Sequence, residues 1–159
     1  MTPTLRRAAR AVVRSPDGCV LLLAFAFPWR DTDLWITPGG ALDDGEDART
    51  ALRRELHEET GLRVDALGPE LWHREHAFTY RDQPILQRER YFLVDTDRFE
   101  PRPHALDPGD ETDWFRGFRW WPIDDLPDEA DHFAPTGLGA HLRDLARDGA
   151  PIEPFRISV

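Results

Sequence analysis

Apolar positions along this chain gather in short runs of strand length, separated by turns. Residues 8–13 and 19–27 are apolar, and the Ser-Pro-Asp-Gly segment at residues 15–18 places Pro and Gly where a type I turn prefers them. These two runs predict a β-hairpin. Residues 34–37 predict a further short strand, which Pro38 and the two glycines after it bring to an end.

Two stretches have helical rather than strand character. Residues 46–60 are good helix formers with acidic residues at their start, and Gly61 provides a stop signal at the end. Residues 139–147 predict a second helix. The remaining predictions are a strand over 62–66, a hairpin over 71–80 and 85–95, a proline-bearing loop over 99–109 and an aromatic strand over 115–121. No repeat, linker or low-complexity tract interrupts the chain, so 1–159 is expected to form a single domain.

Three glutamates of the first helix share one face. Glu55, Glu58 and Glu59 stand at i, i+3 and i+4, which places their carboxylates within reach of a common point. Charged residues of a helix usually face water, but a helical wheel puts these three on the side of Ala51 and Leu52. They therefore abut the interior, where even one unpaired carboxylate costs several kcal/mol.

The cluster predicts a metal site, because a cation can offset the repulsion between three adjacent carboxylates. Ligands that are all oxygen favour Mg²⁺ or Mn²⁺ over Zn²⁺, which prefers Cys or His. The nearest histidine, His57, lies on the opposite side of the helix wheel. Magnesium commonly sits between carboxylates and substrate phosphates, so this site indicates phosphate chemistry.

The overall charge narrows the choice of partners. With 20 basic residues, all arginine, against 30 acidic ones, the formal net charge is −10. This balance argues against nonspecific binding to nucleic acid polymers or to anionic membranes. An anionic small substrate stays open, because a bound metal inverts the local field.

The N-terminal segment and the lone cysteine indicate the compartment. Residues 1–10 lack an apolar segment of secretory length, and the apolar run at 19–28 is too short to span a bilayer. Cys19 lies inside that run and is expected to be a buried core thiol rather than a nucleophile. A cytoplasmic protein is the expectation.

The stretch containing the three glutamates resembles the Nudix box. That pattern is a glycine, five residues, a glutamate, seven residues, Arg-Glu-apolar, one residue, Glu-Glu, one residue and Gly-apolar. All nine constrained positions are present at the required spacing. They are Gly40, Glu46, Arg54, Glu55, Leu56, Glu58, Glu59, Gly61 and Leu62. The resemblance implies an α/β fold, the Nudix-type α/β/α sandwich with a mixed central sheet.

The resemblance also implies an activity and its metal. Nudix enzymes hydrolyse a nucleoside diphosphate linked to another moiety, with Mg²⁺ as cofactor and Mn²⁺ as a substitute. Residue by residue, Glu55, Glu58 and Glu59 would hold the metal together with the backbone carbonyl of Gly40. Glu55 could in addition help to activate the attacking water.

Further roles follow from the same resemblance. Arg54 would position Glu55 through a charge-assisted hydrogen bond, and Glu46 would pair with Arg54 in a structural role. A later loop of such enzymes often supplies one more carboxylate as ligand or base. Glu111 is the candidate here, and Glu89 is its rival.

Recognition of the substrate depends on residues outside the box. Tyr80 stands where the dinucleoside polyphosphate branch tends to carry a tyrosine, whereas the proline of the ADP-ribose branch is missing. Nucleoside triphosphates, dinucleoside polyphosphates and nucleotide sugars all stay open as substrates. The candidates for ring stacking or phosphate contact are Trp29, Arg30, Arg74, Phe78, Tyr80 and Arg90, each of which could instead be a packing or surface residue.

Two further expectations concern the class of protein. A homodimer is possible, as dimers are common in the family. A Nudix-like module that senses a nucleotide without turnover is the alternative function, which the intact box disfavours.

Overall fold

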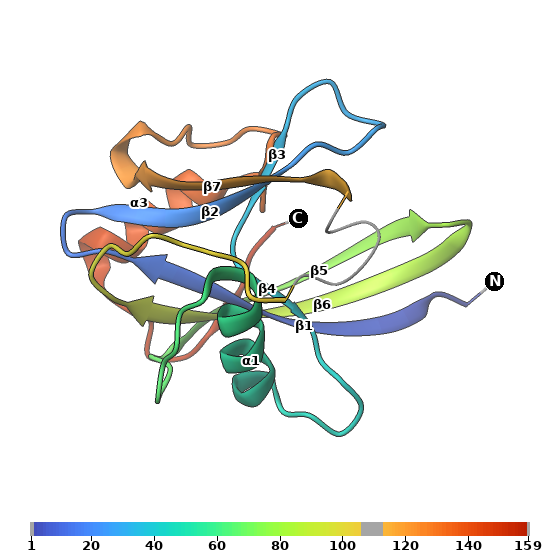
Figure 1. The fold of residues 1–159 in the computed structure, drawn as a ribbon, viewed down its shortest axis with the longest axis horizontal. Coiled ribbons are helices and arrows are strands. Elements are labelled where there is room, and N and C mark those ends of the chain that lie inside the picture. The colour runs from blue at the N-terminus through green and yellow to red at the C-terminus, as the bar shows by residue number, and fades with distance from the viewer. Residues whose placement is uncertain (1, 106–112, 159) are drawn as a thin grey trace.

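A curved mixed sheet forms the centre of the protein (Figure 1). The computed structural model describes residues 2–105 and 113–158. Within them the chain runs through β1 (Thr4–Arg14), β2 (Cys19–Phe25), β3 (Leu34–Ile36), β4 (Gly39–Ala41), α1 (Ala48–Thr60), β5 (Glu70–Tyr80), β6 (Gln83–Asp95), β7 (Phe115–Pro122), a short 3₁₀ turn (Ile123–Asp125), β8 (Phe133–Ala134), α3 (Leu138–Asp148) and β9 (Phe155–Arg156).

The sheet is organised around β1 and β6. These strands pair in parallel over the whole of β1, from Thr4 opposite Ile85 to Arg14 opposite Asp95. The strand order is β8-β3-β2-β1-β6-β5-β9, and β7 pairs with β2 outside this path. Along its other edge β1 meets β2 only at Arg14, and β4 takes that edge at residues 8–10. Where β2 diverges from β1, β4 is therefore brought against the middle of the sheet.

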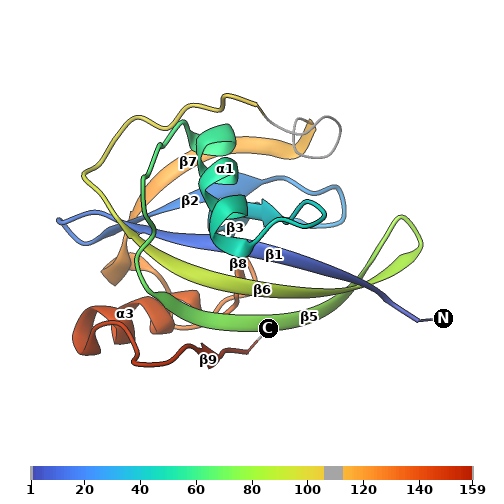
Figure 2. The ribbon, with the colours of Figure 1, turned by 90° about the horizontal axis from the view of Figure 1, so that it is seen from below.

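Side chains alternate between the two faces of β1, and a helix covers each face (Figure 2). Ala9, Ala11 and Val13 pack with Leu52 and Leu56 of α1. On the opposite face, a second core includes Val12, Trp72, Tyr91 and the α3 residues Leu138, Leu142 and Leu145. The predicted α/β/α arrangement with a mixed sheet is thereby confirmed.

Helix α1 begins two residues later than its composition predicts. Asp47 is the N-cap, and its carboxylate accepts a hydrogen bond from the Thr50 N–H at 2.8 Å. Glu46 lies before this cap, and its carboxylate accepts hydrogen bonds from Arg54. At the other end, Gly61 adopts φ +80° and its N–H bonds to the His57 carbonyl, as the stop signal indicates.

The second hairpin, the aromatic strand and the C-terminal helix are confirmed as β5–β6, β7 and α3. The connection between β5 and β6 consists of Arg81 and Asp82, whose positive φ angles of 50° and 64° suit a tight hairpin turn. Residues 99–105 form no regular element, as predicted, while the rest of that loop lies outside the described residues.

Other predictions were wrong in part. No strand forms over residues 62–66, because Leu62 and Val64 pack against the α1 side of the core without a neighbouring strand edge to pair with. The first hairpin is reduced to a single register pair, Arg14 opposite Val20, and the main partner of β2 is β7. Cys19 is buried, as expected of a core thiol. In the part of the chain described, no helix is long and apolar enough to cross a membrane.

Candidate active site

The box begins where β4 crosses the inward face of α1. The N–H of Gly39 donates to Oε1 of Glu59 at 2.7 Å. At Gly40, a Cβ atom would come within 2.6 Å of Cδ of Glu55 and within 2.8 Å of both its carboxylate oxygens. The Glu55 carboxylate therefore rests directly on the Cα of Gly40, an approach that only glycine permits.

Gly39 is needed for a different reason. Its φ is +146°, and a Cβ would lie 2.1 Å from the carbonyl oxygen of Ala9 on β1. Gly39 thus allows β4 to pack closely against β1, and Gly40 allows it to pack closely against Glu55.

The three glutamates differ in how deeply they lie. Glu55 is 6% exposed and Glu59 is 2% exposed, whereas the side chain of Glu58 is 31% exposed. Glu55 and Glu59 thus turn inward as the helical wheel indicates, and Glu58 lies at the rim. This geometry places one carboxylate toward the open side and two against the β4 backbone.

Arg54 ties the loop to the carboxylates. Its guanidinium makes a two-point contact with Glu46, at 3.0 Å from Nε and 2.8 Å from Nη2. Nη1 donates to Oε1 of Glu55 at 3.0 Å and to Oε2 of Glu58 at 3.3 Å. The hydrogen bond from Arg54 lowers the pKa of Glu46, so this carboxylate stays ionised. The pairing of Glu46 with Arg54, and the contact of Arg54 with Glu55, are as expected.

The donor set suits a hard divalent cation. It comprises the carboxylates of Glu55, Glu58 and Glu59 and the carbonyl of Gly40, all of them oxygen ligands. Among residues 2–105 and 113–158, however, no three acidic, His or Cys side chains stand at metal-binding spacing. The Arg54 guanidinium and the Gly39 N–H hold the carboxylates in place. A metal would therefore replace some of these contacts. Glu111 lies outside the described residues.

A second buried cluster lies behind Gly39, around Glu89 on β6. Glu89 is 3% exposed, and Nε of Arg10 donates to its Oε2 at 2.8 Å, while Arg74 donates to its Oε1. Nη1 of Arg10 also reaches the carbonyls of Thr37 and Gly39 at 3.4 and 3.3 Å. The cluster thus joins the sheet to the peptide that bonds Glu59.

Two arginines decide the ionisation of Glu89. Burial alone would raise its pKa, but the charges of Arg10 and Arg74 outweigh burial and bring the pKa down to about 2. With both oxygens held by arginine, Glu89 is better suited to structural support than to accepting a proton. Arg74, a candidate phosphate contact, is likewise buried in this ion pair, and its contact with a substrate stays a prediction.

The remaining substrate-binding candidates are scattered. Trp29 is 67% exposed in the β2–β3 loop and stacks on Phe27 at 5.0 Å, so one face of the indole is supported. Arg30 in the same loop donates to the carbonyl of Asp131 at 2.5 Å. Phe78 and Tyr80 lie toward the tip of the β5–β6 hairpin. Arg90 points to the α1 face of the sheet and pairs with Glu70 at 2.7 Å.

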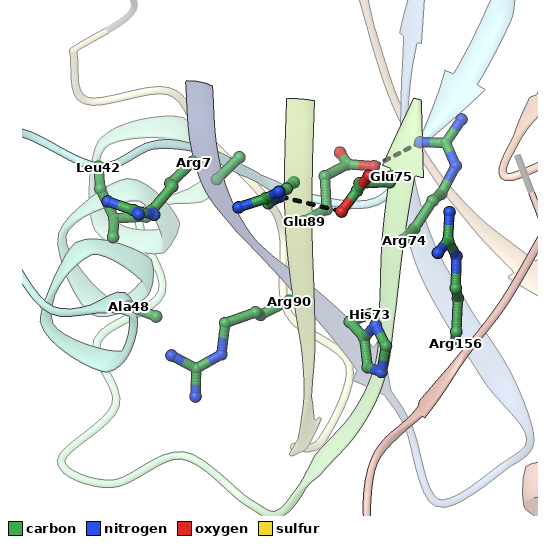
Figure 3. Close-up of a pocket in the computed structure, with 11 residues that line it drawn as sticks. Arg7, Leu42, Ala48, His73, Arg74, Glu75, Glu89, Arg90 and Arg156 are labelled. Carbon is green, nitrogen blue, oxygen red and sulfur yellow. Dashed lines mark hydrogen bonds and ion pairs between the residues drawn. The ribbon is translucent and has the colours of Figure 1, made fainter. Parts of the chain in front are cut away.

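The sequence interpretation missed Arg10, Gly39 and an arginine-lined cavity of about 260 Å³ on the α1 face (Figure 3). Arginines at positions 7, 74, 88, 90 and 156 line this cavity, together with Glu75 and Glu89. The alternation of arginine around Glu89 on β6 was the available signal, since it puts Arg88 and Arg90 on one face.

Comparisons with known proteins support the family that the box resembles. The family model of the NUDIX domain matches residues 4–138. A protein of Mesorhizobium japonicum named RNA pyrophosphohydrolase is 36% identical over 107 residues, which are 61% of this chain and 61% of that protein. One of the same name from Rhodopseudomonas palustris strain HaA2 is 31% identical over 110 residues, 62% of this chain and 64% of its own. The chain thus spans less than two thirds of the length of these relatives.

A solved structure supports the fold. The crystal structure of a MutT NUDIX hydrolase from Burkholderia pseudomallei superposes with a TM-score of 0.63 at 24% identity. The match covers 88% of this chain and 97% of that one.

Proposed function

Because the chain belongs to the NUDIX domain family, we propose that it is a divalent-metal-dependent pyrophosphohydrolase acting on a nucleoside diphosphate linked to another moiety. The observation that carries this proposal is the packing of Glu55 and Glu59 on the Gly39–Gly40 peptide, with Arg54 bridging Glu55 and Glu58. Mg²⁺ is the proposed ion and Mn²⁺ its substitute, because every candidate ligand is an oxygen.

The roles of the residues follow from their contacts. Glu55, Glu58, Glu59 and the Gly40 carbonyl would hold the metal, with Glu111 as a further candidate. When bound, such an ion neutralises phosphate oxygens and makes a water more acidic. Arg54 keeps the carboxylate of Glu55 oriented against Gly40, and Glu55 accepts the proton of the attacking water.

The substrate is proposed from the family and from the relatives. Nucleoside triphosphates, dinucleoside polyphosphates and nucleotide sugars each contain the required diphosphate. The name of the relatives adds a fourth candidate, the 5′ end of an RNA. The exclusion of nucleic acid polymers, which we expect from the net charge of −10, therefore needs a direct test. The cytoplasmic location and the homodimer likewise stay predictions.

Removal of the metal should abolish turnover. We expect hydrolysis of at least one of the four substrate classes with Mg²⁺ or Mn²⁺, detected as the two products of the cleaved phosphoanhydride, and loss of these products in excess EDTA. A panel of the four classes, assayed with each metal, ranks the substrates. Full activity under chelation would contradict the mechanism. Calorimetric binding of a nucleotide without any released product would instead favour the sensing module.

The Gly40→Ala variant tests the contact between β4 and α1. The added methyl group must displace the Glu55 carboxylate, and misplacing a catalytic group by about 1 Å can cost about 100-fold in rate. We expect a loss of that order in kcat, with a far-ultraviolet circular dichroism spectrum like that of the unmodified protein. Gly137→Ala is the matched control, because its Cβ would meet the end of the His141 side chain at 3.3 Å and the carbonyl oxygen of Asp128 no nearer than 4.0 Å. Equal activity of both variants would show that the position of the Glu55 carboxylate does not affect turnover.

A further inference from the structure

The arginine-lined cavity lies beside α1, and Arg74 and Glu89 of the Glu89 cluster are among the residues that line it (Figure 3). Arg88 and Arg90 alternate with Glu89 along β6, so they point to the face where Phe92 packs under α1. His73 of β5 pairs in register with Arg90 and also with Arg156 of β9. Figure 3 shows Arg7 beside Leu42 at the α1 side of the cavity and Arg156 at its far side.

Positive charge exceeds negative charge in this cavity. Arg88 pairs with Glu75 at 2.9 Å and Arg90 with Glu70 at 2.7 Å, and about half of each arginine side chain is exposed. For Arg7 and Arg156, no ion pair is found with any residue in the described ranges. With Arg74, five arginines line the cavity, against the carboxylates of Glu75 and Glu89 in the lining and of Glu70 beside it, on a molecule whose net charge is −10.

Among the arginines proposed here, a ring contact within the described residues accounts for the position of Arg90. The guanidinium carbon of Arg90 lies 5.4 Å from the centre of the Phe92 ring, a favourable cation–π contact. No such ring contact is found for Arg7 or Arg156 in the part of the chain described. A phosphate group would offer all of them a charged, bidentate acceptor.

The cavity adjoins the candidate active site through β4 and α1. Leu42, which lines it, follows Gly40 by two residues, and its N–H donates to the carbonyl of Arg7 at 2.9 Å. Ala48, another lining residue, precedes Glu55 by seven positions, about 10 Å along the same helix face. That separation exceeds the length of the diphosphate that is cleaved and suits later phosphates of a longer chain.

The acidic loop limits the direction of such a chain. Asp43, Asp44 and Asp47 line a second hollow, which shares Arg7 and Leu42 with the cavity. Their negative charges disfavour an anionic ligand in that hollow, whereas His73 and Arg156 at the rest of the cavity favour one.

We propose that this cavity, lined by Arg7, Arg88, Arg90 and Arg156, binds the phosphodiester backbone of a single-stranded RNA whose 5′-terminal diphosphate occupies the carboxylate site. The proposal rests on the proposed function and selects RNA among its substrates. It departs from the expectation drawn from net charge, because the basic groups are concentrated in one place.

The test separates RNA binding from catalysis. A short single-stranded RNA with a 5′-hydroxyl has no phosphoanhydride bond for the enzyme to hydrolyse. Its affinity can therefore be measured by fluorescence anisotropy at several salt concentrations. The variant is Arg7→Gln/Arg156→Gln, which leaves the ion pairs of Arg74, Arg88 and Arg90 intact. The control is Arg63→Gln/Arg147→Gln, which makes the same change in charge at positions that do not line the cavity.

We expect RNA affinity to fall at least about 10-fold in the cavity variant but not in the control. The slope of log affinity against log salt should decrease by about 0.7 for each RNA phosphate that the variant no longer neutralises. In the kinetic arm, kcat/KM should fall for a 5′-triphosphate RNA and stay unchanged for ATP, which also shows that the variant is folded.

Three results would overturn the proposal. They are unchanged RNA affinity in the cavity variant, an equal loss in the control, and a loss of inorganic triphosphate binding with RNA binding intact, which would indicate a site for small anions. If RNA affinity depends on the cavity but the unmodified protein cleaves no phosphoanhydride, the proposed function fails while the binding site stands.

Discussion

Replacing Glu59 with glutamine should lower kcat by at least about 100-fold while the fold survives. A metal clamp contributes several kcal/mol of transition-state stabilisation, and each 1.36 kcal/mol is tenfold in rate. The amide oxygen of glutamine can still accept the hydrogen bond from the Gly39 N–H, so the buried contact is retained. Glu58→Gln, at the rim, should lose a comparable factor with even less effect on folding.

Two measurements check this result. Steady-state kinetics with Mg²⁺ give kcat, and calorimetric titration with Mn²⁺ in the absence of substrate gives the affinity for the ion. Both should fall together in the variants. Glu153→Gln is the control, because Glu153 is exposed near the C-terminus. Unchanged turnover and unchanged Mn²⁺ affinity in either box variant would remove these residues from the metal site.

Replacing Glu89 with alanine should destabilise the protein by about 3–5 kcal/mol, the cost of breaking a buried ion pair by removing one partner. Arg74 is 6% exposed and would be left as a buried charge, and Arg10 would lose the partner that holds it beneath Gly39. Urea unfolding at neutral pH measures the change. Glu75→Ala, which removes the partly exposed partner of Arg88, should cost no more than about 1 kcal/mol.

The ionisation of Glu89 also predicts that the free energy of unfolding decreases at acidic pH. The pKa of Glu89 in the folded protein is about 2, below its usual value of 4.5. The stabilisation it provides is therefore complete above pH 4.5 and is lost as pH falls toward 2. The free energy of unfolding, followed over that range, should fall less steeply in Glu89→Gln, which cannot ionise. If the free energy of unfolding fell equally steeply in that variant, the loss of stability at acidic pH would come from other groups.

Local patterns are sufficient for the parts of this protein that depend on neighbours in the chain. The spacing of Glu55, Glu58 and Glu59 places them on one helix face because the period of a helix is fixed, and Gly61 ends that helix because it can adopt a positive φ. The β5–β6 hairpin follows from two apolar runs joined by a short polar turn. The Nudix box could be identified for the same reason, since all its required residues lie within one loop and the helix that follows.

Pairing between distant segments required the folded chain. Residues 62–66 have strand-like composition, yet no strand edge lies beside them, whereas β4 is only three residues long and pairs with β1 because β2 has diverged. The candidate stacking and phosphate residues lie apart, with Trp29 in the β2–β3 loop, Tyr80 at the end of β5 and Arg90 within β6, and composition gives no sign of this separation. Strand assignment depends on which edges are available, and that is a property of the whole sheet.

The sequence alone therefore determined the carboxylate helix, its glycine-bearing entry and the acidic balance of charge. Only the tertiary structure showed that Glu89 is saturated by Arg10 and Arg74, and that Arg7 and Arg156 lie around one cavity with Arg88 and Arg90. The physical reason is the distance along the chain, because these groups come from separate strands and Arg10, for example, lies 79 residues from Glu89. Their contacts depend on the parallel pairing of β1 with β6 and on the placement of β9 beside β5.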